Sequence, residues 1–512
     1  MTRAAAARRL GPRTRLAIDV VGALGLVGTL VRYLSLSALA PVAVALGYGE
    51  SPWPFLGAGA IAGAIGLALE RIAARRPRRV GWREGSLVIS LTWLLAAAYG
   101  GLPYVLAGVP GLDRPIDALF EGMSGFTTTG ASLLLDFEAL NHSMAMWRQL
   151  TQWLGGLGII VLAFAILPRL HVGGRQLLES ELPGPEINQL GDRVRQTVRR
   201  FWVLYVALTV LEAIALAVVG WTGLDDRMSP FDAIAHALTT IPTGGFSPES
   251  RSLEGFAAAT HWVVIVFMFL AGMNFALLWG ALLRGRIRAL LRDDELQLYA
   301  VVLAAAAGLL VVELATEDLS GSDNPLRHGV FQAVALMTGT GFATVDFAGW
   351  PTLALMTIVA LMFFGGAAGS TTGSVKLLRH VIVARSLKRE LRLAVHPESV
   401  RAVRFNRSPV ENDVVRAAIV FVLLYLGLFV AGTGIIALDA SFDGPTLTAL
   451  DAFSTAASTL GNVGPASGPA GPMASYESFS DVSTIVMSAL MWLGRLEILP
   501  VLVLFTRTYW RR

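Results

Sequence analysis

Residues 115–132 read PIDALFEGMSGFTTTGAS, and this stretch contains the pattern that decides the fold. A short proline-led apolar run is followed by a segment rich in glycine and threonine, and then by a long apolar run. The same pattern returns at residues 230–247 (PFDAIAHALTTIPTGGFS), 325–344 (PLRHGVFQAVALMTGTGFAT) and 445–465 (PTLTALDAFSTAASTLGNVGP). Self-similarity of this kind indicates an architecture built from repeated units. We predict four units, each a helix, a re-entrant pore helix, a glycine-rich strand and a second helix.

The apolar runs around these loops are long enough to cross a bilayer. The chain has 512 residues, of which 54% are hydrophobic and 15% charged. Runs of about 20 apolar residues are typical of transmembrane helices. We predict about ten spans, at 17–47, 54–73, 86–107, 144–168, 198–221, 260–283, 296–315, 350–385, 412–437 and 482–505. The first run is too long for a cleavable signal peptide, so we expect an all-α polytopic membrane protein.

Basic residues collect in alternate connections between the predicted spans. They are Arg8, Arg9, Arg13 and Arg15; Arg75, Arg76, Arg78 and Arg79; and the stretches 193–200, 284–292, 379–407 and 511–512. The intervening connections are acidic, as at Glu50, Asp117 and Asp232. The positive-inside rule then predicts that both termini are cytoplasmic. The net charge of +4 therefore reflects topology, and we expect no nucleic-acid partner.

The four Gly/Thr segments have the composition that a dehydrated cation needs. Irregular backbone at membrane depth persists only where it lines a cavity. A ring of carbonyl oxygens can replace the hydration shell of a cation, and glycine tolerates the backbone angles that point successive carbonyls inward. An ordinary turn between spans explains any single loop as well, but four such loops in the same position favour one pseudo-fourfold pore. The chain has no cysteine, which excludes disulfides and thiol chemistry.

The motifs SGFTTTGAS, TTIPTGGFS, MTGTGFATVDF and STLGNVGPA resemble the Trk/Ktr/HKT superfamily of cation transporters, in particular the TrkH/TrkG-type membrane subunit of bacterial potassium uptake systems. The resemblance covers the whole chain, including the opening helix pair. It implies one filter glycine per loop, with backbone carbonyls of the residues just before it binding K⁺, and no covalent cofactor. The implied filter residues are Thr128, Thr129, Gly130, Pro242, Thr243, Gly244, Gly339, Thr340, Gly341, Asn462, Val463 and Gly464. Glycine in all four loops implies potassium preference.

The segment 364–374 reads FGGAAGSTTGS inside the predicted span 350–385. So many glycines and hydroxyls predict a broken helix that faces a cavity, although close packing of small residues is an alternative. The resemblance implies an intramembrane gate under the filter. The implied gate residues are Gly365, Gly366, Gly369, Ser370, Thr371, Thr372, Gly373 and, on the last span, Arg495. We expect Lys376 to extend to the inner interface, and an Arg495–Glu497 pair is unfavoured because residues i and i+2 do not face each other.

The remaining polar residues suggest no catalysis. Glu121 and His236, on pore helices, are expected to brace the filter, and Glu212 and Glu313 could pair with neighbouring helices. We find no metal-ligand spacing among the histidines and no nucleophile elbow, so we expect no enzyme. A cation-coupled secondary transporter, using H⁺ or Na⁺ in symport, is the alternative function.

The predicted organisation is an N-terminal two-helix extension at 1–80 and four pore repeats at 81–172, 190–288, 293–390 (with the gate loop at 364–375) and 405–512. The resemblance further implies a bacterial inner-membrane location, a homodimer and a TrkA-like ring of cytoplasmic nucleotide-binding subunits. These subunits would dock on the basic faces 193–200 and 379–407. Topology and anionic lipid alone are an alternative explanation of those faces.

Overall fold

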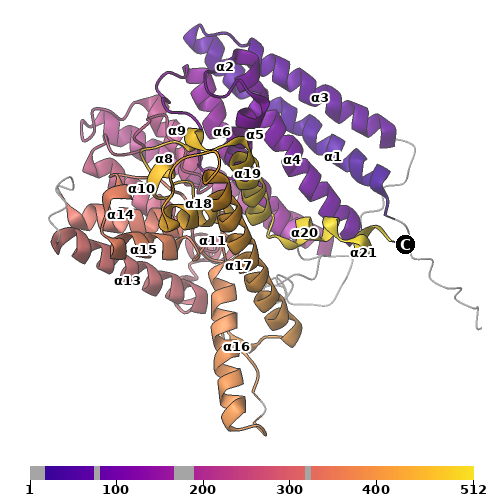
Figure 1. The fold of residues 1–512 in the computed structure, drawn as a ribbon, viewed down its shortest axis with the longest axis vertical. Coiled ribbons are helices and arrows are strands. Elements are labelled where there is room, and N and C mark those ends of the chain that lie inside the picture. Colours follow the sequence, from indigo (N-terminus) through magenta and orange to yellow (C-terminus); the bar gives the residue numbers. More distant parts are fainter. Residues whose placement is uncertain (1–17, 74–80, 166–189, 317–323, 400, 512) are drawn as a thin grey trace, which may run out of the picture.

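The computed structural model describes residues 18–73, 81–165, 190–316, 324–399 and 401–511. Side chains are not described at 159–165 and 190–195, and the basic clusters around Arg8 and Arg75 lie outside the described residues. Within the described part, strands are limited to one antiparallel hairpin of β1 (Arg404–Phe405) and β2 (Ser408–Pro409). The rest of the regular structure is helical, which confirms the all-α prediction (Figure 1).

The helices follow the order that the sequence pattern predicts. The N-terminal pair of spans consists of α1 (Val20–Ser35), η1 (Leu36–Ala38) and α2 (Leu39–Tyr48), which form the first, and α3 (Trp53–Ala73), which is the second. Next come α4 (Trp82–Ala107), α5 (Pro115–Phe126), α6 (His142–Ala165), α8 (Leu190–Trp221), α9 (Pro230–Thr240), α10 (Ala258–Ala271), α11 (Phe275–Arg284) and α12 (Ile287–Leu291). Then follow α13 (Asp294–Thr316), α14 (Pro325–Met337), η4 (Phe347–Gly349), α15 (Thr352–Leu361) and α16 (Leu377–Val395). The last are α17 (Asn412–Ala440), α18 (Ala449–Gly461), η5 (Gly468–Ala470), η6 (Tyr476–Ser478), α19 (Asp481–Arg495), α20 (Leu499–Leu502), η7 (Val503–Phe505) and α21 (Arg507–Trp510).

Six helices in the described residues are long and apolar enough to span a membrane, or up to eight if each of two bent pairs counts as one span. The chain is thus a multi-pass membrane protein. The predicted spans 260–283 and 482–505 are not straight, since α10 and α11 meet at 107° and α19 and α20–η7 at 114°. Gly272 and the N-cap Asn274 break the first; positive φ at Glu497 and Ile498 breaks the second. The predicted span 350–385 is split into α15 and α16, and the end of 144–168 lies outside the described residues.

The pore helices begin where local hydrogen bonding dictates. In α5, α9 and α14 a proline occupies the first turn, where its missing N–H costs nothing. The fourth helix, expected from Pro445, begins at Ala449 instead. Thr448 and Asp451 form a reciprocal capping box there, with bonds of 2.9 and 3.2 Å, and this pair sets the helix start more strongly than the proline.

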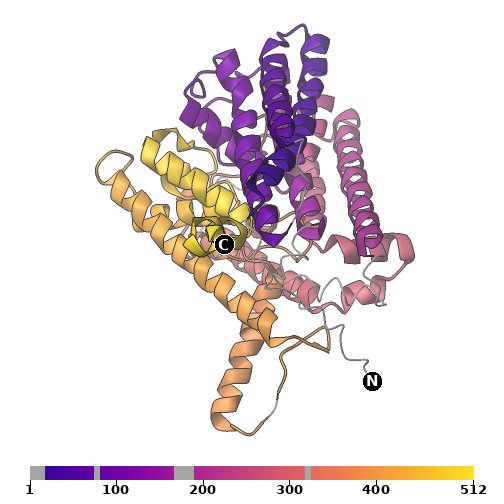
Figure 2. The ribbon, with the colours of Figure 1, turned by 90° about the vertical axis from the view of Figure 1, so that its right-hand side faces the viewer.

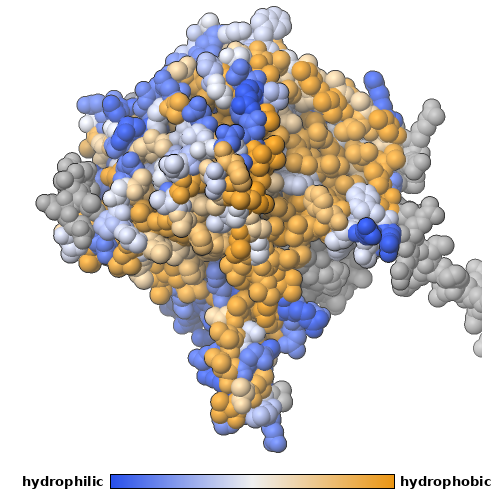
Figure 3. Space-filling view, viewed as in Figure 1, coloured by the Kyte–Doolittle hydropathy of each residue, from blue (hydrophilic) through white to orange (hydrophobic). Residues whose placement is uncertain are grey.

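Apolar side chains cover the outer faces of the long helices. Figure 3 shows a broad hydrophobic surface over the side of the molecule where α1, α3 and α4 lie in Figure 1. Exposed Val203, Val210 and Ile214 continue this character on α8. In both ribbon views α16 extends away from the helical body (Figures 1 and 2). Such surfaces match a lipid solvent, in which exposed apolar side chains carry no cost.

Candidate ion pathway

Each pore helix ends in the same pair of backbone hydrogen bonds, and these bonds align the four loops residue by residue. One N–H reaches the carbonyl three residues back, at 2.9–3.4 Å, in Thr128→Gly125, Thr243→Thr240, Gly339→Leu336 and Asn462→Thr459. The next N–H reaches five residues back, at 2.8–2.9 Å, in Thr129→Ser124, Gly244→Thr239, Thr340→Ala335 and Val463→Ser458. The equivalent triads, which we call the loop triads, are therefore 128–130, 243–245, 339–341 and 462–464.

The sign of φ alternates along each loop triad. The first and third residues have φ of 51° and 87° in 128–130, 57° and 79° in 243–245, 70° and 75° in 339–341, and 55° and 106° in 462–464. The middle residues are outside this positive region. A residue with a side chain, such as Thr128, rarely adopts positive φ, so the surrounding structure must enforce this backbone conformation. Alternating signs turn successive carbonyls toward one side, whereas a regular strand turns them to opposite sides.

The second loop differs by one residue from the sequence-based assignment. Its hydrogen bonds make Gly245, not Gly244, equivalent to Gly130, and Gly244 takes the middle position. Pro242 precedes the loop triad. The two adjacent glycines misled the sequence reading, but a usable signal was present. Gly245 and Gly341 are each followed by phenylalanine, and this shared Gly-Phe pair sets the register.

The loop triads contact one another in a closed ring. The third residue of each triad is a glycine that lies against the carbonyl oxygen of the middle residue of the next triad. The contacts are Gly130 with Gly244, Gly245 with Thr340, Gly341 with Val463, and Gly464 with Thr129. A Cβ at any of these glycines would overlap that oxygen. Only glycine therefore permits the ring to close.

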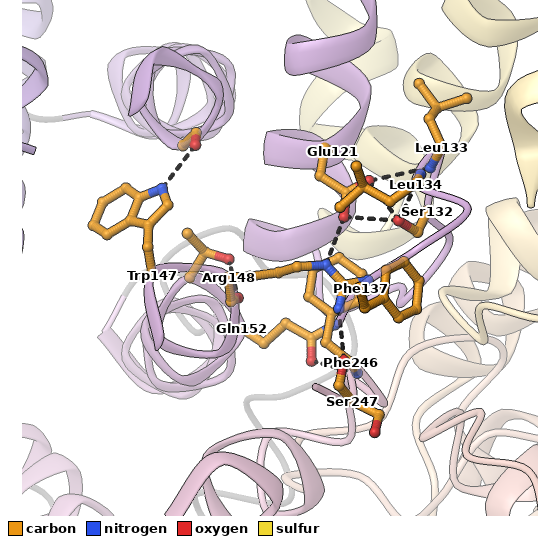
Figure 4. Close-up of polar contacts among 12 residues, drawn as sticks. Glu121, Ser132, Leu133, Leu134, Phe137, Trp147, Arg148, Gln152, Phe246 and Ser247 are labelled. Atoms are coloured by element: carbon orange, nitrogen blue, oxygen red, sulfur yellow. Dashed lines mark hydrogen bonds and ion pairs between the residues drawn. The ribbon is translucent and has the colours of Figure 1, made fainter. Parts of the chain in front are cut away.

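A buried ion pair between Arg148 and Glu121 links the first pore loop to the second (Figure 4). Arg148 of α6 donates through Nε to Glu121 of α5 at 2.7 Å and through Nη1 to the carbonyl of Ser247 at 3.0 Å. Glu121 also accepts from Ser132 Oγ at 3.0 Å. The guanidinium lies 3.5 Å from the ring centroid of Phe246. Glu121 thus accepts from one side chain and one backbone N–H of the segment that follows the first loop triad.

Sequence reasoning missed Arg148 and Gln152, and it gave Asn462 as a filter residue without its link to the first loop. Gln152 donates to the carbonyl of Gly244 at 2.7 Å and accepts from the Phe246 N–H at 3.0 Å. Asn462 donates to Thr129 Oγ1 at 3.0 Å, which links the fourth loop to the first. Arg148 and Gln152 lie one turn apart on α6, and the signal for both was a polar residue inside an apolar span.

The segment between α15 and α16 folds into a compact loop. Gly365 donates to Val375 at 2.7 Å, so the two limbs of the loop run beside each other. Thr371 Oγ1 donates to the carbonyl of Ile241 at 2.9 Å, two residues before the second loop triad. Gly373 packs against Gly461 and Asn462 of the fourth loop. The loop therefore touches two of the four pore loops, at Ile241 just before the second loop triad and at Asn462 in the fourth.

Two basic side chains, those of Arg495 and Lys376, hold this loop. Arg495 is buried and donates through Nη1 to the Thr371 carbonyl at 2.8 Å. Lys376 was expected at the inner interface, but its ammonium turns back and donates to the Thr372 carbonyl at 2.6 Å. Because Lys376 directly follows the loop, the carbonyls of Ser370 and Thr372 are within reach of its ammonium. Glu497 pairs with Arg379 at 2.5 Å and not with Arg495.

Known proteins match this chain over nearly its whole length. A model of the TrkH family, described as a cation transport protein, matches residues 70–511. The chain belongs to this family. The family description is one of transport and not of an enzyme class.

Relatives of the TrkH family match nearly the full chain. The Trk system potassium uptake protein TrkH of Halomonas elongata is 34% identical over 96% of this chain and 99% of its own. The TrkG protein of Escherichia coli K12 is 34% identical over 94% of this chain and 97% of its own. The crystal structure of the potassium transporter TrkH from Vibrio parahaemolyticus superposes with a TM-score of 0.85 at 30% identity, covering 96% of this chain and 100% of that one.

Proposed function

We propose that this protein takes up potassium through one pore in a bacterial inner membrane, with the four loop triads as its selectivity filter. The observation that carries the proposal is the closed ring of loop triads with alternating φ. The names of the full-length relatives, which are potassium uptake proteins, support the ion. Carbonyl oxygens of residues 128–130, 243–245, 339–341 and 462–464 would replace the hydration shell of K⁺.

The pore helices add an electrostatic contribution to this filter. α5, α9, α14 and α18 end directly before the loop triads, within three residues of the first triad position. Each helix C-terminus carries about half a negative charge. Four such ends directed at one region stabilise a cation there without placing a carboxylate in its path.

The loop at 364–375 is the gate in this proposal. Its contacts with Ile241, Gly461 and Asn462 support a position next to the filter, on its cytoplasmic side. Arg495 holds the loop through Thr371 and adds a positive charge near the permeation path. Movement of the loop would open the path without disturbing the loop triads.

Rubidium flux into proteoliposomes tests the transport function. We expect uptake driven by the rubidium gradient alone, with and without an imposed proton gradient. A sodium gradient forms the third arm. Flux that disappears without a proton or sodium gradient would overturn conduction and establish coupled transport, and absence of any flux would overturn the function itself.

Two partners complete the proposal. The relatives are named as parts of a Trk system, which supports a separate regulatory subunit, and we place its docking on the basic stretches 193–200 and 379–407 on the cytoplasmic side. A homodimer of the membrane subunit would present two such faces. Co-purification with the product of a neighbouring gene and light scattering of the purified protein test these points, and a monodisperse monomer without a bound partner would contradict both.

A further inference from the structure

Three consecutive acidic residues at the start of α13 face three different elements. Asp293 Oδ1 accepts the N–H groups of Glu295 and Leu296 at 3.0 and 2.9 Å, so it caps the helix. Its other oxygen accepts from Asn406 Nδ2 at 2.7 Å. Asp294 Oδ2 accepts from Arg385 of α16 at 2.7 Å. Glu295 is 1% exposed and turns inward.

Glu295 joins the gate loop to the start of α16 with a single oxygen. Oε1 accepts the Ala368 N–H at 2.7 Å and the Leu378 N–H at 2.8 Å. Ala368 is on the first limb of the loop, and Leu378 is in the first turn of α16. Backbone N–H groups in a buried site must have an acceptor. Because one oxygen accepts both N–H groups, Ala368 and the first turn of α16 stay side by side while Glu295 holds them.

The two aspartates connect this buried contact to exposed structure. Asn406 is in the turn of the β1–β2 hairpin, and its backbone N–H donates to Asp294 at 2.9 Å. Arg385 also donates to the Arg404 carbonyl at 2.6 Å. The hairpin, α16 and the start of α13 are thus joined by charge-assisted hydrogen bonds. Displacement of the hairpin or of α16 would pull directly on the helix end that carries Glu295.

We propose that Glu295 is a positioning residue that latches the gate loop under the filter, and that Asp293 and Asp294 connect this latch to the β1–β2 hairpin and α16. The proposal rests on the gate function of the loop given above. A force on the hairpin from the cytoplasmic side is transmitted through Asp294 to Glu295. Release of the two N–H groups frees residues 368–378 to leave the pathway.

The natural absence of cysteine allows a direct test. Ala368→Cys provides a single thiol on the loop, and its modification by a membrane-impermeant reagent is timed in the parent and in three further variants. In Glu295→Ala both N–H groups lose their acceptor, and we expect modification and rubidium flux to rise about tenfold. Glu295→Gln keeps an amide oxygen for both, and we expect values within about twofold of the parent. Glu313→Ala, on the same helix, serves as the matched control.

The outcomes separate the latch from the proposed function and from simple misfolding. Unchanged modification and flux in Glu295→Ala would overturn the latch, as would equal disruption by alanine and glutamine. If Glu295→Ala does not purify, Arg385→Ala tests the same connection from the exposed side, and we expect flux to rise about threefold; no rise would overturn the connection. A parent protein that conducts no rubidium refutes the transport function, while the modification rates still decide the latch.

Discussion

Glycine is required at the third position of each loop triad, whereas the first position accepts other residues although its φ is also positive. The first positions hold Thr128, Thr243, Gly339 and Asn462, all at positive φ. Side chains are thus tolerated there, at a cost of about 1–2 kcal/mol each. The third positions are all glycine, because a Cβ would overlap a carbonyl of the neighbouring loop. Contact between loops, and not the sign of φ alone, makes these glycines irreplaceable.

The register of the second loop leads to a paired prediction. Gly245→Ala places a methyl on the Thr340 carbonyl at a φ of 79°. The atoms nearest to a Cβ in Gly244→Ala belong to the end of the Gln152 side chain, which can move more readily than a backbone carbonyl. We expect Gly245→Ala to reduce rubidium flux by at least about tenfold and Gly244→Ala by about threefold or less. Equal losses of proteoliposome flux in the two variants would contradict the assignment of Gly245 as the filter glycine of this loop.

Gly130→Ser tests selectivity at the same scale. The serine Cβ would overlap the Gly244 carbonyl, so the first and second loops must move apart. We expect the K⁺ over Na⁺ permeability ratio to fall by about tenfold. Gly427→Ser is the control, since nothing lies within 4 Å of a Cβ at that lipid-facing glycine. Reversal potentials in bilayers measure the ratio, and an unchanged value removes this loop from the filter.

The Arg148–Glu121 pair gives a prediction about stability. Arg148→Met leaves a buried carboxylate unpaired, and such losses cost about 3–5 kcal/mol. The double variant with Glu121→Gln removes both charges and should recover part of the loss. Thermal denaturation in detergent measures both. Arg251→Ala, from the exposed Arg251–Glu254 pair, should change stability by less than about 1 kcal/mol, and a similar loss there would contradict the assignment.

At the scale of elements, the sequence predicts what local composition controls. Apolar runs predict α1 to α4, α8, α13 and α17, and the glycines of 364–374 predict the break between α15 and α16. The sharp bends after α10 and α19 were not predicted, although Gly272 and Asn274 gave a local signal for the first. Positive φ at Glu497 and Ile498 is enforced by packing, and no residue preference signals it. The start of α18 was predictable from the capping box of Thr448 and Asp451, which sets the helix start more strongly than Pro445 does.

The contact between α19 and the gate loop carries the element-scale prediction. Arg495→Ala removes the donor to the Thr371 carbonyl and a charge beside the pathway. We expect basal rubidium flux to rise about fivefold with an unchanged K⁺ over Na⁺ ratio, since the loop triads keep their own contacts. Arg507→Ala at the exposed end of the chain is the control. Reduced or unchanged flux would show that Arg495 does not restrain the loop.

At the scale of the whole molecule, one carboxylate fastens the N-terminal helices to the start of α6. Glu50 follows α2 and accepts the N–H groups of His142 and Ser143 at 2.9 and 2.8 Å, which caps α6 across a long sequence separation. His142 stacks on Tyr48 with ring centroids 4.0 Å apart. Burial disfavours the charge of Glu50, but the bonds from Ser143 and His142 outweigh it and lower its pKa below the ordinary 4.5.

This lowered pKa predicts how stability depends on pH. A carboxyl with a depressed folded-state pKa adds stability above its ordinary value of 4.5, and that contribution disappears as pH falls through the folded-state pKa. Glu50→Gln lacks the contribution at every pH. We therefore expect the variant to melt at a lower temperature than the parent at pH 6, and the difference to narrow below about pH 4. A difference in melting temperature that stays constant with pH would show that Glu50 acts by shape alone, because only the charged form accepts these bonds more strongly than an amide.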